Sequence, residues 1–401
     1  MINDALKIID AALKNSDPYK NVSDALSDKE YPDNLTVVAA GKAACTMAKA
    51  AYDILGNKIS KGFVLTKYFH SFPMPDVFDV FEAGHPLPDE NSIKHTRTIV
   101  DYAKNLTEKD RILFLLSGGA SALFELSAVS LEELISTTDK LLRCGADITE
   151  INIIRKKLSE VKGGKFANMC KCRIECLILS DVLGDKIEMI ASGPCCSDNS
   201  TADDVYEIIN KYNLDLKSDF NFDKTTVTNA ENKIIGSLSM LCNGAKECAE
   251  KLGYDAKIIT TSLIGEAQNV GKEIAEKAIE FSQKPHKKSV FIYGGETTVT
   301  VKGRGKGGRN QEIALSASIA LKNQPDILLF SLGSDGTDGP TDAAGGIVDG
   351  ISYSKMISAG INPDDYLNNN DSYNALDSIG ALIRTGPTGT NVNDITVVIV
   401  K

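Results

Sequence analysis

Three cationic side chains stand among four glycines in the segment GRGKGGR, residues 303–309. Consecutive glycines let the backbone turn its N–H groups toward one point, and an arginine at a helix start suits bidentate recognition of a carboxylate or phosphate. A solvated hairpin explains Arg304 and Lys306 well. It explains Arg309 less well, because GGRNQE has too many special features for a passive helix start. We therefore predict that Arg309 is the functional cation, with Gly308 and Asn310 beside it.

Two further glycine-rich turns follow apolar segments that read as strands. Gly41-Lys42 stands between such a strand and a helix of small residues, so Lys42 could contact an anion at the helix start, although an ordinary turn with a solvated lysine is the alternative. Ser117-Gly118-Gly119-Ala120-Ser121 offers successive amides and two hydroxyls, which suits a nest for phosphate or carboxylate. Tight strand–helix packing that needs glycine explains the same segment about as well.

Oxygen-bearing side chains gather in two later loops. The segment GSDGTDGPTDAAGG, residues 333–346, has turns of the kind that lie beside Mg²⁺, which makes Asp335 and Asp338 the candidate metal residues. Aspartate and glycine also dominate ordinary turns. In RTGPTGTNVNDI, residues 384–395, the side chains that could contact phosphate oxygens or cap a turn are Thr388, Thr390 and Asn391.

Asp181, in LILSDVLGD, comes directly off a strand-like segment and could act as a base, a metal ligand or a helix cap. His85, in AGHPLP, has no partner at a meaningful spacing and is interpreted as an isolated structural histidine. Cys170, Cys172 and Cys176 lack a second pair or a histidine to complete four zinc ligands, so we expect reduced, packed thiols.

The known nucleotide and hydrolase fingerprints do not explain these loops. The chain has no G-x4-G-K-[ST], and no strand leads into G-x-G-x-x-G with an acidic residue about 20 positions on. It also has no G-x-S-x-G and no H-E-x-x-H. Any phosphorylated ligand must therefore be held by a less familiar arrangement.

The repeating unit of the chain is an apolar run, a glycine-rich turn and a helical pattern. Runs at 35–40, 111–116, 174–180, 289–293 and 326–332 are apolar throughout, which predicts strands covered on both faces. We expect two α/β domains, at 1–225 and 226–401, with a polar connection near 215–233. The first should have a largely parallel, Rossmann-like sheet. The second should have a mixed sheet, because TTVTVKG at 297–303 alternates as an antiparallel strand would.

Composition narrows the class of ligand. A length of 401 residues with a net charge of −10 predicts a globular protein of more than one domain and argues against nucleic-acid binding. No apolar run approaches the ~18 residues of a membrane span. The first residues place Ile2, Leu6, Ile9 and Leu13 at helical spacing and lack the basic start of a signal peptide. We expect a packed first helix and a cytoplasmic protein.

Taken together, the segments resemble the glycerate 2-kinase family whose C-terminal half is called the MOFRL domain. The resemblance covers nearly the whole chain. It rests on VVAAGKAA, EAGHPLPDENS, LLSGGASAL, INIIRKKLSEVKGGKFA, LILSDVLGDKIEMIASGP, YGGETTVTVKGRGKGGRNQEIAL, GSDGTDGPTDAAGGIVDG, LNNNDSY and TGPTGTNVNDI.

The resemblance implies two α/β domains facing a cleft, ATP and Mg²⁺ as co-substrates, and phosphorylation of D-glycerate to 2-phosphoglycerate. We expect a monomer or homodimer. It also implies functional roles for Lys42, Asp181 and Arg309, and we place Arg155, in INIIRKKLS, among the expected substrate or phosphate contacts. Lys42 and Arg309 would face each other across the cleft, and Asp181 would accept or orient the C2 hydroxyl proton. Two departures bear on substrate preference: Lys157 stands where a histidine is usual, and CCSDNST at 195–201 replaces a segment rich in proline and threonine.

Two other classes of protein remain open. An NAD(P)-dependent hydroxypyruvate reductase is disfavoured by the lack of a strand-linked dinucleotide fingerprint. A non-catalytic sensor of acidic metabolites would use the same cationic loops and predicts binding without turnover.

Overall fold

The computed structural model describes residues 1–216, 224–285 and 287–401 and divides into two compact units. The N-terminal unit comprises residues 18–235, and the C-terminal unit comprises residues 1–17 together with 236–401. This differs from the predicted division after residue 225, because the first helix belongs to the C-terminal unit. Within the predicted connection at 215–233, residues 217–223 lie outside the described part of the chain. Residues from 230 onward are already strand β6 of the N-terminal sheet.

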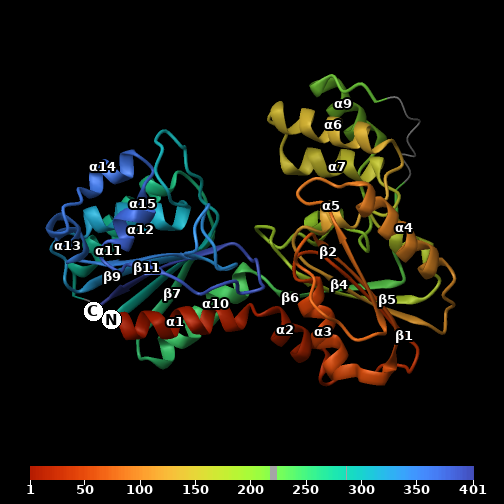
Figure 1. The fold of residues 1–401 in the computed structure, drawn as a ribbon, viewed down its shortest axis with the longest axis horizontal. Coiled ribbons are helices and arrows are strands. Elements are labelled where there is room, and N and C mark those ends of the chain that lie inside the picture. Colours follow the sequence, from red (N-terminus) through yellow and green to blue (C-terminus); the bar gives the residue numbers. More distant parts are fainter. Residues whose placement is uncertain (217–223, 286) are drawn as a thin grey trace. The chain divides into compact units, whose positions relative to one another are not determined.

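A parallel sheet forms the centre of the N-terminal unit, as predicted (Figure 1). Its strand order is β3-β2-β1-β4-β5-β6, and the pairs from β3 to β5 are all parallel. The predicted strands at 35–40, 111–116 and 174–180 are confirmed. The strands are β1 (Leu35–Ala40), β2 (Ile59–Lys67), β3 (Phe78–Ala83), β4 (Arg111–Leu116), β5 (Arg173–Leu179) and β6 (Ala230–Gly236).

Helices cover both faces of this sheet, which explains why its central strands are apolar at every position. On β4, Leu113 and Leu115 pack in one core with residues of α2 and α3. Ile112, Phe114 and Leu116 pack in a second core on the other face, with residues of α4, α5 and α8. The helices α6, α7 and α9 form a further group with its own apolar core (Figure 1). The bounds are α2 (Pro18–Leu26), α3 (Ala44–Leu55), α4 (Glu90–Lys104), α5 (Ala120–Leu123), α6 (Leu131–Arg143), α7 (Ile148–Leu158), α8 (Lys165–Met169) and α9 (Ala202–Tyr212), with 3-10 turns at Gly56–Lys58 and Ile187–Ser192.

The C-terminal unit has the mixed sheet that the sequence predicts, in the order β11-β10-β9-β12-β8-β7. β7 and β8 are parallel, whereas β12 runs antiparallel to both β8 and β9. The last strand of the chain is therefore central, and its first residue lies beside the ends of β8 and β9. The strands are β7 (Asp255–Leu263), β8 (Ser289–Gly295), β9 (Ile327–Gly333), β10 (Gly345–Asp349), β11 (Leu382–Ile383) and β12 (Asp394–Val400).

The predicted antiparallel strand at 297–303 is wrong. Only Thr298 makes a single bridge, to Glu266, and this bridge is parallel. The Thr300 N–H donates to the Glu266 carboxylate, and the Lys302 and Gly303 N–H groups donate to the Asn370 side chain. Side chains therefore take the hydrogen bonds that a neighbouring strand would have made.

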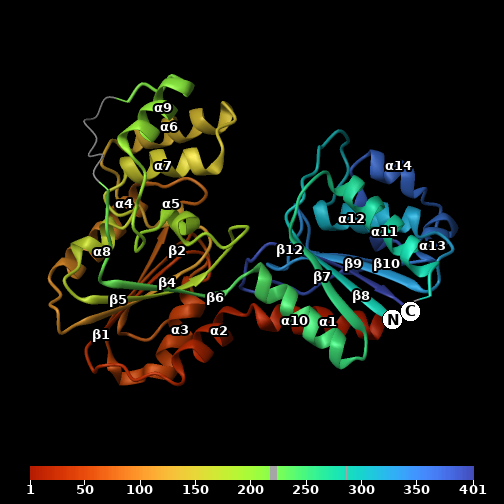
Figure 2. The same cartoon turned by 180° about the vertical axis from the view of Figure 1, so that it is seen from behind.

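Two helical layers enclose the mixed sheet (Figure 2). α10 packs on one face and carries α1 on its outer side, while α11 and α12 share a core with β9 and β12 on the other face. The bounds are α1 (Ile2–Asn15), α10 (Leu238–Lys251), α11 (Ala267–Ser282), α12 (Arg309–Ala320), α13 (Ser352–Ser358), α14 (Pro363–Asn368) and α15 (Ser372–Asp377). Among the described residues, none of the helices combines the length and the apolar character that crossing a membrane requires.

The first helix is confirmed, but its buried face matches the predicted one only in part. Ile9 is buried as predicted, whereas Ile2 and Leu6 are more than half exposed. The other buried residues of the helix are Ala5, Ile8 and Ala12. Small residues on this face let α1 approach α10 closely. The spacing of large apolar residues therefore identified Ile9 and missed Ala5, Ile8 and Ala12.

Ile8→Ala should lower the free energy of unfolding by about 2–5 kcal/mol, because it removes a fully buried aliphatic side chain. Leu6→Ala is the matched control on the same helix and should cost less than about 0.5 kcal/mol. Urea unfolding measures both values, and amide hydrogen exchange locates the effect. If Ile8→Ala increased the exchange rates of residues 18–235 more than those of α10, the assignment of α1 to the C-terminal unit would be contradicted.

Candidate functional site

In the N-terminal unit the turns after β1 and β4 are joined to each other through the backbone. The Lys42 N–H donates to the Gly118 carbonyl at 2.9 Å, and the Ala43 N–H donates to Ser117 Oγ at 3.1 Å. Gly41 has a φ of +124°, and any side chain there would overlap Ser117. Part of the 117–121 segment thus serves the tight packing that was one of its two interpretations, and the same contacts place Lys42 at the carboxyl edge of the sheet.

Asp181 and His85 lie against the same loop. A methyl group at Gly118 would overlap Asp181 Oδ2, so this carboxylate lies directly beside the loop. A methyl group at Gly119 would lie 3.0 Å from His85 Cδ2 and 3.3 Å from Lys42 Cγ. The structure therefore brings together Lys42, Asp181 and the 117–119 loop, all predicted to be functional, and adds His85 to them.

His85 is not the isolated histidine that the sequence suggests. It is half-buried, and burial together with the nearby charges of Lys42, Lys67 and His70 lowers its pKa to about 4. Its imidazole is consequently neutral at physiological pH. No spacing in the sequence points to it, because its neighbours follow other strands.

Ser121 and Arg155 line a small cavity of about 10 Å³ beside α5. Glu125 lines the same cavity, and one of its carboxylate oxygens is buried with no hydrogen-bond partner among the described residues. Burial lowers the pKa of Arg155, and the Glu125 charge acts the other way. This space holds about one water molecule. The structure thus places Ser121 and Arg155 together, in a space much smaller than an organic substrate.

The glycine-rich loop that opens α12 does not form a free nest. Its N–H groups donate to neighbouring parts of the chain: Arg304 N–H to Asn369 Oδ1, Gly305 N–H to the Asn369 carbonyl, and Lys306 N–H to Asp371 Oδ1. Side chains at Gly303, Gly305 and Gly307 would overlap this Asn369–Ser372 segment. The expectation that these amides converge on a ligand is wrong, because a distant segment occupies the open side of the loop.

The three cations of this loop have different surroundings. Arg304 is exposed, and the Lys306 ammonium lies 4.1 Å from the ring centre of Tyr373. The Arg309 Nε and Nη2 donate to the two oxygens of Asp394, at 2.5 and 3.0 Å, and Nη1 lies 2.7 Å from Glu296 Oε1. Arg309 is therefore the one of the three whose head group two carboxylates hold in place.

Charge and burial act in opposite directions around this arginine. Burial alone would lower the pKa of Arg309, but the hydrogen bonds to Asp394 and the charges of Asp394, Glu296 and Asp338 together outweigh it and raise the pKa. Burial raises the pKa of Asp394, and the Arg309 guanidinium acts against that rise. The Arg309 side chain keeps 35% of its surface exposed, so a ligand can still contact it.

Asp338 acts as the cap of α12. Its carboxylate accepts from the Gln311 N–H at 2.8 Å and from the Asn310 N–H at 3.2 Å, and any side chain at Gly308 would overlap it. Burial raises the pKa of Asp338 to about 6, and the hydrogen bonds from Gln311 and Asn310 act the other way. The Asn310 side chain is itself buried, with Oδ1 accepting from Ser331 Oγ at 2.6 Å. Gly308, Asn310 and Asp338 thus build the start of α12.

The two oxygen-rich loops meet beside Asp394. A methyl group at Gly333 would lie 3.3 Å from Asp335 Oδ1 and 3.4 Å from Asp394 Oδ1. The Thr388 hydroxyl donates to the Ser334 carbonyl, and its N–H donates to the Asp335 carbonyl. Asp335 and Thr388 therefore share a neighbourhood with the carboxylate that holds Arg309.

The remaining predicted residues of the 384–395 loop are less accessible. Thr390 is 5% exposed, and its hydroxyl has no hydrogen-bond partner among the described residues. Asn391 is half-buried. Thr388 is thus the residue of this loop with the best-defined position beside Asp394.

The acidic groups fit a magnesium ion only in part. The Asp338 oxygens are engaged by helix N–H groups, whereas Asp335 Oδ1 accepts a single N–H, from Thr337. In the described part of the chain no three His, Cys, Asp or Glu residues are grouped as metal ligands. Mg²⁺ commonly binds one or two carboxylates and completes its shell with substrate phosphates and water. Asp335 is compatible with such a site, and Asp338 belongs to the helix cap.

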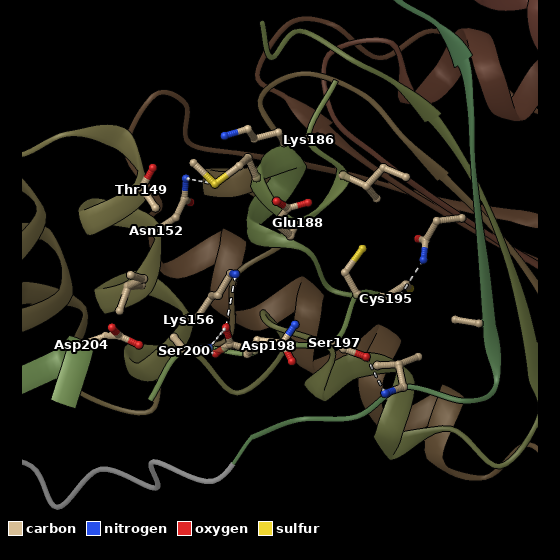
Figure 3. A pocket seen from close by; sticks show the side chains of 18 residues that line it. Thr149, Asn152, Lys156, Lys186, Glu188, Cys195, Ser197, Asp198, Ser200 and Asp204 are labelled. Atoms are coloured by element: carbon tan, nitrogen blue, oxygen red, sulfur yellow. Dashed lines mark hydrogen bonds and ion pairs between the residues drawn. The ribbon is translucent and has the colours of Figure 1, made fainter. Parts of the chain in front are cut away.

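A cavity of about 670 Å³ lies elsewhere in the N-terminal unit, between α7, the turn at 187–192 and residues 195–204 (Figure 3). None of the predicted site residues lines it. Lys156 Nζ lies 3.4 Å from Asp198 Oδ1, and Lys157 Nζ lies 3.0 Å from Asp198 Oδ2, with all three side chains buried. The two departures noted in the sequence, Lys157 and the 195–201 segment, therefore meet at one buried ion pair.

Sequence reasoning missed Glu296, Asp394 and His85. Glu296 follows β8 directly, and Asp394 is the first residue of β12. A carboxylate at a strand end, in the segments GGET and NVNDI, was the signal in the sequence that could have identified them. The antiparallel course of β12 brings these two ends together. That course is a property of the sheet order, which no local pattern contains.

The N-terminal unit carries a lysine, an aspartate and a glycine-rich loop at one edge of a parallel sheet, and the C-terminal unit carries an arginine that two carboxylates hold in place. These features define a two-unit α/β protein. Residues 4–222 match a domain of unknown function, DUF4147, and residues 289–394 match the MOFRL family. The D-glycerate 2-kinase of Thermotoga maritima is 49% identical over 402 residues, which cover 98% of this chain and 96% of the relative. A crystal structure of glycerate kinase from Thermotoga maritima superposes with a TM-score of 0.95 at 47% identity, covering 100% of this chain and 99% of the other.

The chain therefore belongs to the glycerate kinase family, with a C-terminal MOFRL domain. More distant relatives carry another name. A protein of Agrobacterium vitis with the provisional name hydroxypyruvate reductase is 36% identical over 414 residues, which cover 98% of this chain and 93% of the relative.

Asp338→Ala should lower the free energy of unfolding by about 1–3 kcal/mol, because it leaves buried N–H groups at the start of α12 without an acceptor. Asp338→Asn keeps an acceptor oxygen and should cost less. Asp342→Ala, in the same loop but exposed, should cost less than about 1 kcal/mol. Equal losses for the two alanine variants in urea unfolding would show that Asp338 is not the cap of α12.

Proposed function

We propose that this protein is an ATP-dependent kinase that phosphorylates the 2-hydroxyl of D-glycerate, giving 2-phosphoglycerate and ADP. The observation that carries the proposal is the convergence of Lys42, Asp181 and the 117–119 loop at one edge of the parallel sheet, in a chain of the glycerate kinase family. Phosphoryl transfer asks mainly for positioning and for positive charge around the moving group. This edge offers both.

In the N-terminal unit, Lys42 would neutralise negative charge on the phosphoryl group or on the glycerate carboxylate. Asp181, beside Gly118, would accept or orient the proton of the hydroxyl that attacks phosphorus. The Gly118 and Gly119 N–H groups and the Ser117 hydroxyl would hold the anionic end of a substrate, and Gly41 lets Ser117 approach closely. Arg155 and Ser121 line a cavity too small for glycerate, so we propose that they support this loop from behind.

In the C-terminal unit, Arg309 is the proposed phosphate contact. Each of its Nη atoms carries a second N–H beyond the one directed at Asp394 or Glu296. The two carboxylates would fix the plane of the guanidinium and leave those N–H groups for phosphate oxygens. Thr388, Thr390 and Asn391 would line the same region, and Gly308 and Asn310 would act by building the helix start.

Mg²⁺, when bound, neutralises phosphate charge and orients the phosphates for in-line transfer. Asp335 would hold it together with oxygens of the nucleotide, since this carboxylate lies near Asp394 and accepts only one N–H. Asp338 would act indirectly, by holding the start of α12, the helix that carries Arg309. The chain's own residues thus offer few ligands, as is usual for Mg²⁺ in kinases.

We propose that one phosphoryl group is contacted by Lys42 from one unit and by Arg309 from the other during transfer. Each unit supplies a cation and glycine-rich loops, and phosphoryl transfer draws on positive charge from several groups around the moving phosphoryl. Bringing the two cations to one substrate would also exclude water and limit hydrolysis of ATP. The oligomeric state, monomer or homodimer, and a cytoplasmic location remain predictions.

The alternative, an NAD(P)-dependent hydroxypyruvate reductase, is favoured only by the name of more distant relatives. No strand of the N-terminal sheet leads into a dinucleotide fingerprint. Incubation with glycerate and either ATP or NAD(P)⁺ separates the two activities, because only one mixture should give product.

Lys42→Ala and Arg309→Ala should each lower kcat at least about 100-fold, since each removes a cation proposed to stabilise the transferring group. Lys49→Ala on α3 and Arg143→Ala on α6 are matched controls, because these cations pair with aspartates one helical turn away on the surface. Steady-state assays with D-glycerate and ATP give the rates, and circular dichroism verifies the fold. A near-normal rate in a folded Lys42 or Arg309 variant would remove that residue from the mechanism.

Phosphorus NMR of the product formed from ATP and D-glycerate tests the proposed position of transfer. The 2-phosphate and the 3-phosphate of glycerate differ in chemical shift, so one spectrum distinguishes them. We expect the 2-phosphate alone. Accumulation of the 3-phosphate would show that the 3-hydroxyl, and not the 2-hydroxyl, is placed beside Asp181.

A further inference from the structure

The His85 imidazole occupies the same side of the glycine loop as Lys42. Its Cδ2 and Nε2 atoms lie 3.0 and 3.2 Å from the position that a Gly119 Cβ would take, and Lys42 Cγ lies 3.3 Å from that position. Asp181 lies against the preceding glycine, Gly118. Lys42 and His85 thus lie beside Gly119, and Asp181 lies beside the adjacent Gly118.

The other charged groups around His85 come from the ends of neighbouring strands. Lys42 follows β1, Lys67 ends β2 and His70 comes shortly after it, and all three act against protonation of His85. In the part of the chain that the structure describes, no hydrogen bond or ion pair engages the His85 imidazole. A half-buried ring nitrogen beside three cationic or titratable groups is an unusual place for a purely structural histidine.

We propose that His85 is a further substrate-contacting residue of this site and that its imidazole gains a proton when an anionic substrate binds. The ligand class is a small carboxylate or phosphate anion. The inference rests on the proposed function, because it requires the 117–119 loop to be where the anion binds.

The physical reason is a change in the sign of the local charge. In the free protein, burial and the charges of Lys42, Lys67 and His70 hold the pKa of His85 near 4, so the ring is neutral at pH 6. A bound carboxylate or phosphate would offset those cations, and an anion within about 4–6 Å of a titratable group favours its protonated form. The protonated ring would then add a cation at the loop only while substrate is present.

His70 is the competing acceptor of that proton. Burial and the charges of Lys67 and Lys42 also lower the pKa of His70, while the Glu82 charge raises it. The nearest neighbours of Gly119 include the His85 ring and do not include His70. Separate substitution of the two residues therefore identifies the site of proton uptake.

The test is the protonation state of each imidazole with and without D-glycerate. Its carboxylate is fully ionised at pH 6, since α-carboxyl groups titrate near a pKa of about 3.5, so the ligand itself takes up no proton. The chain has four histidines, and single substitutions assign their imidazole ¹⁵N signals. We expect the His85 signals to report a neutral ring in the free protein at pH 6 and an imidazolium with saturating D-glycerate. Calorimetry in buffers of different ionisation enthalpy should show uptake of about one proton per site.

The variants give a second, independent readout. His85→Gln should weaken D-glycerate binding roughly 10-fold or more and abolish proton uptake. His95→Gln is the matched control. His95, on α4, stacks on Phe81 of β3 with ring centroids 4.2 Å apart, and its substitution should leave both binding and proton uptake unchanged. Binding with the His85 ring still neutral, or uptake that persists in His85→Gln and disappears in His70→Gln, would overturn the inference alone. Absence of any D-glycerate binding to the unmodified protein would overturn the proposed function as well.

Discussion

The hydrogen bonds that join the β1–α3 turn to the loop after β4 are the constraint on which the candidate site depends. The Lys42 N–H to Gly118 and the Ala43 N–H to Ser117 Oγ fix two strand ends relative to each other. Gly41 and Gly118 leave no room for side chains, so the lysine and Asp181 approach a single loop from different strands. Parallel strands end at one edge of a sheet. The two hydrogen bonds fix Lys42 and the 117–119 loop at that edge, beside Asp181.

In the C-terminal unit, ion pairs hold the candidate cation, Arg309, in position. Arg309 begins α12, where the positive end of the helix dipole disfavours another cation. Asp394 and Glu296 offset that cost and hold the guanidinium in one orientation, while Asp338 satisfies the first N–H groups of the helix. One buried and one exposed carboxylate thus position the arginine, and a third builds the helix that carries it. The antiparallel return of β12 makes this possible, because it brings Asp394 to the ends of β8 and β9.

The sequence predicted the architecture well where burial makes strong patterns. Strands such as β1 and β4 are covered on both faces, so nearly every residue is apolar and each run ends in a visible glycine turn. The alternation of side-chain types at 297–303 predicted a strand that does not form. The N–H groups of this segment donate to the side chains of Glu266 and Asn370 and not to a neighbouring strand. Among the loops, glycine content alone did not separate a ligand nest from close packing: residues 303–307 are glycine-rich because the Asn369–Ser372 segment passes against them.

Residues such as His85 show why part of the site could not be predicted. It follows β3, whereas the groups that surround it follow β1, β2 and β4, so only the order of strands in the sheet brings them together. The same holds for Asp394 and Arg309, which are paired although they lie far apart in the chain. Local pattern identifies the strand ends that carry polar groups, and the sheet order decides which of them become neighbours.

The most direct measurement of the central claim is a crystal structure of the protein with ADP, aluminium fluoride as a planar mimic of the transferring phosphoryl group, Mg²⁺ and D-glycerate. The account predicts that the Lys42 ammonium and an Arg309 Nη atom both lie within about 3 Å of the fluorines or oxygens of that one group. A complex in which the mimic is bound and either side chain contacts a different part of the protein would contradict it.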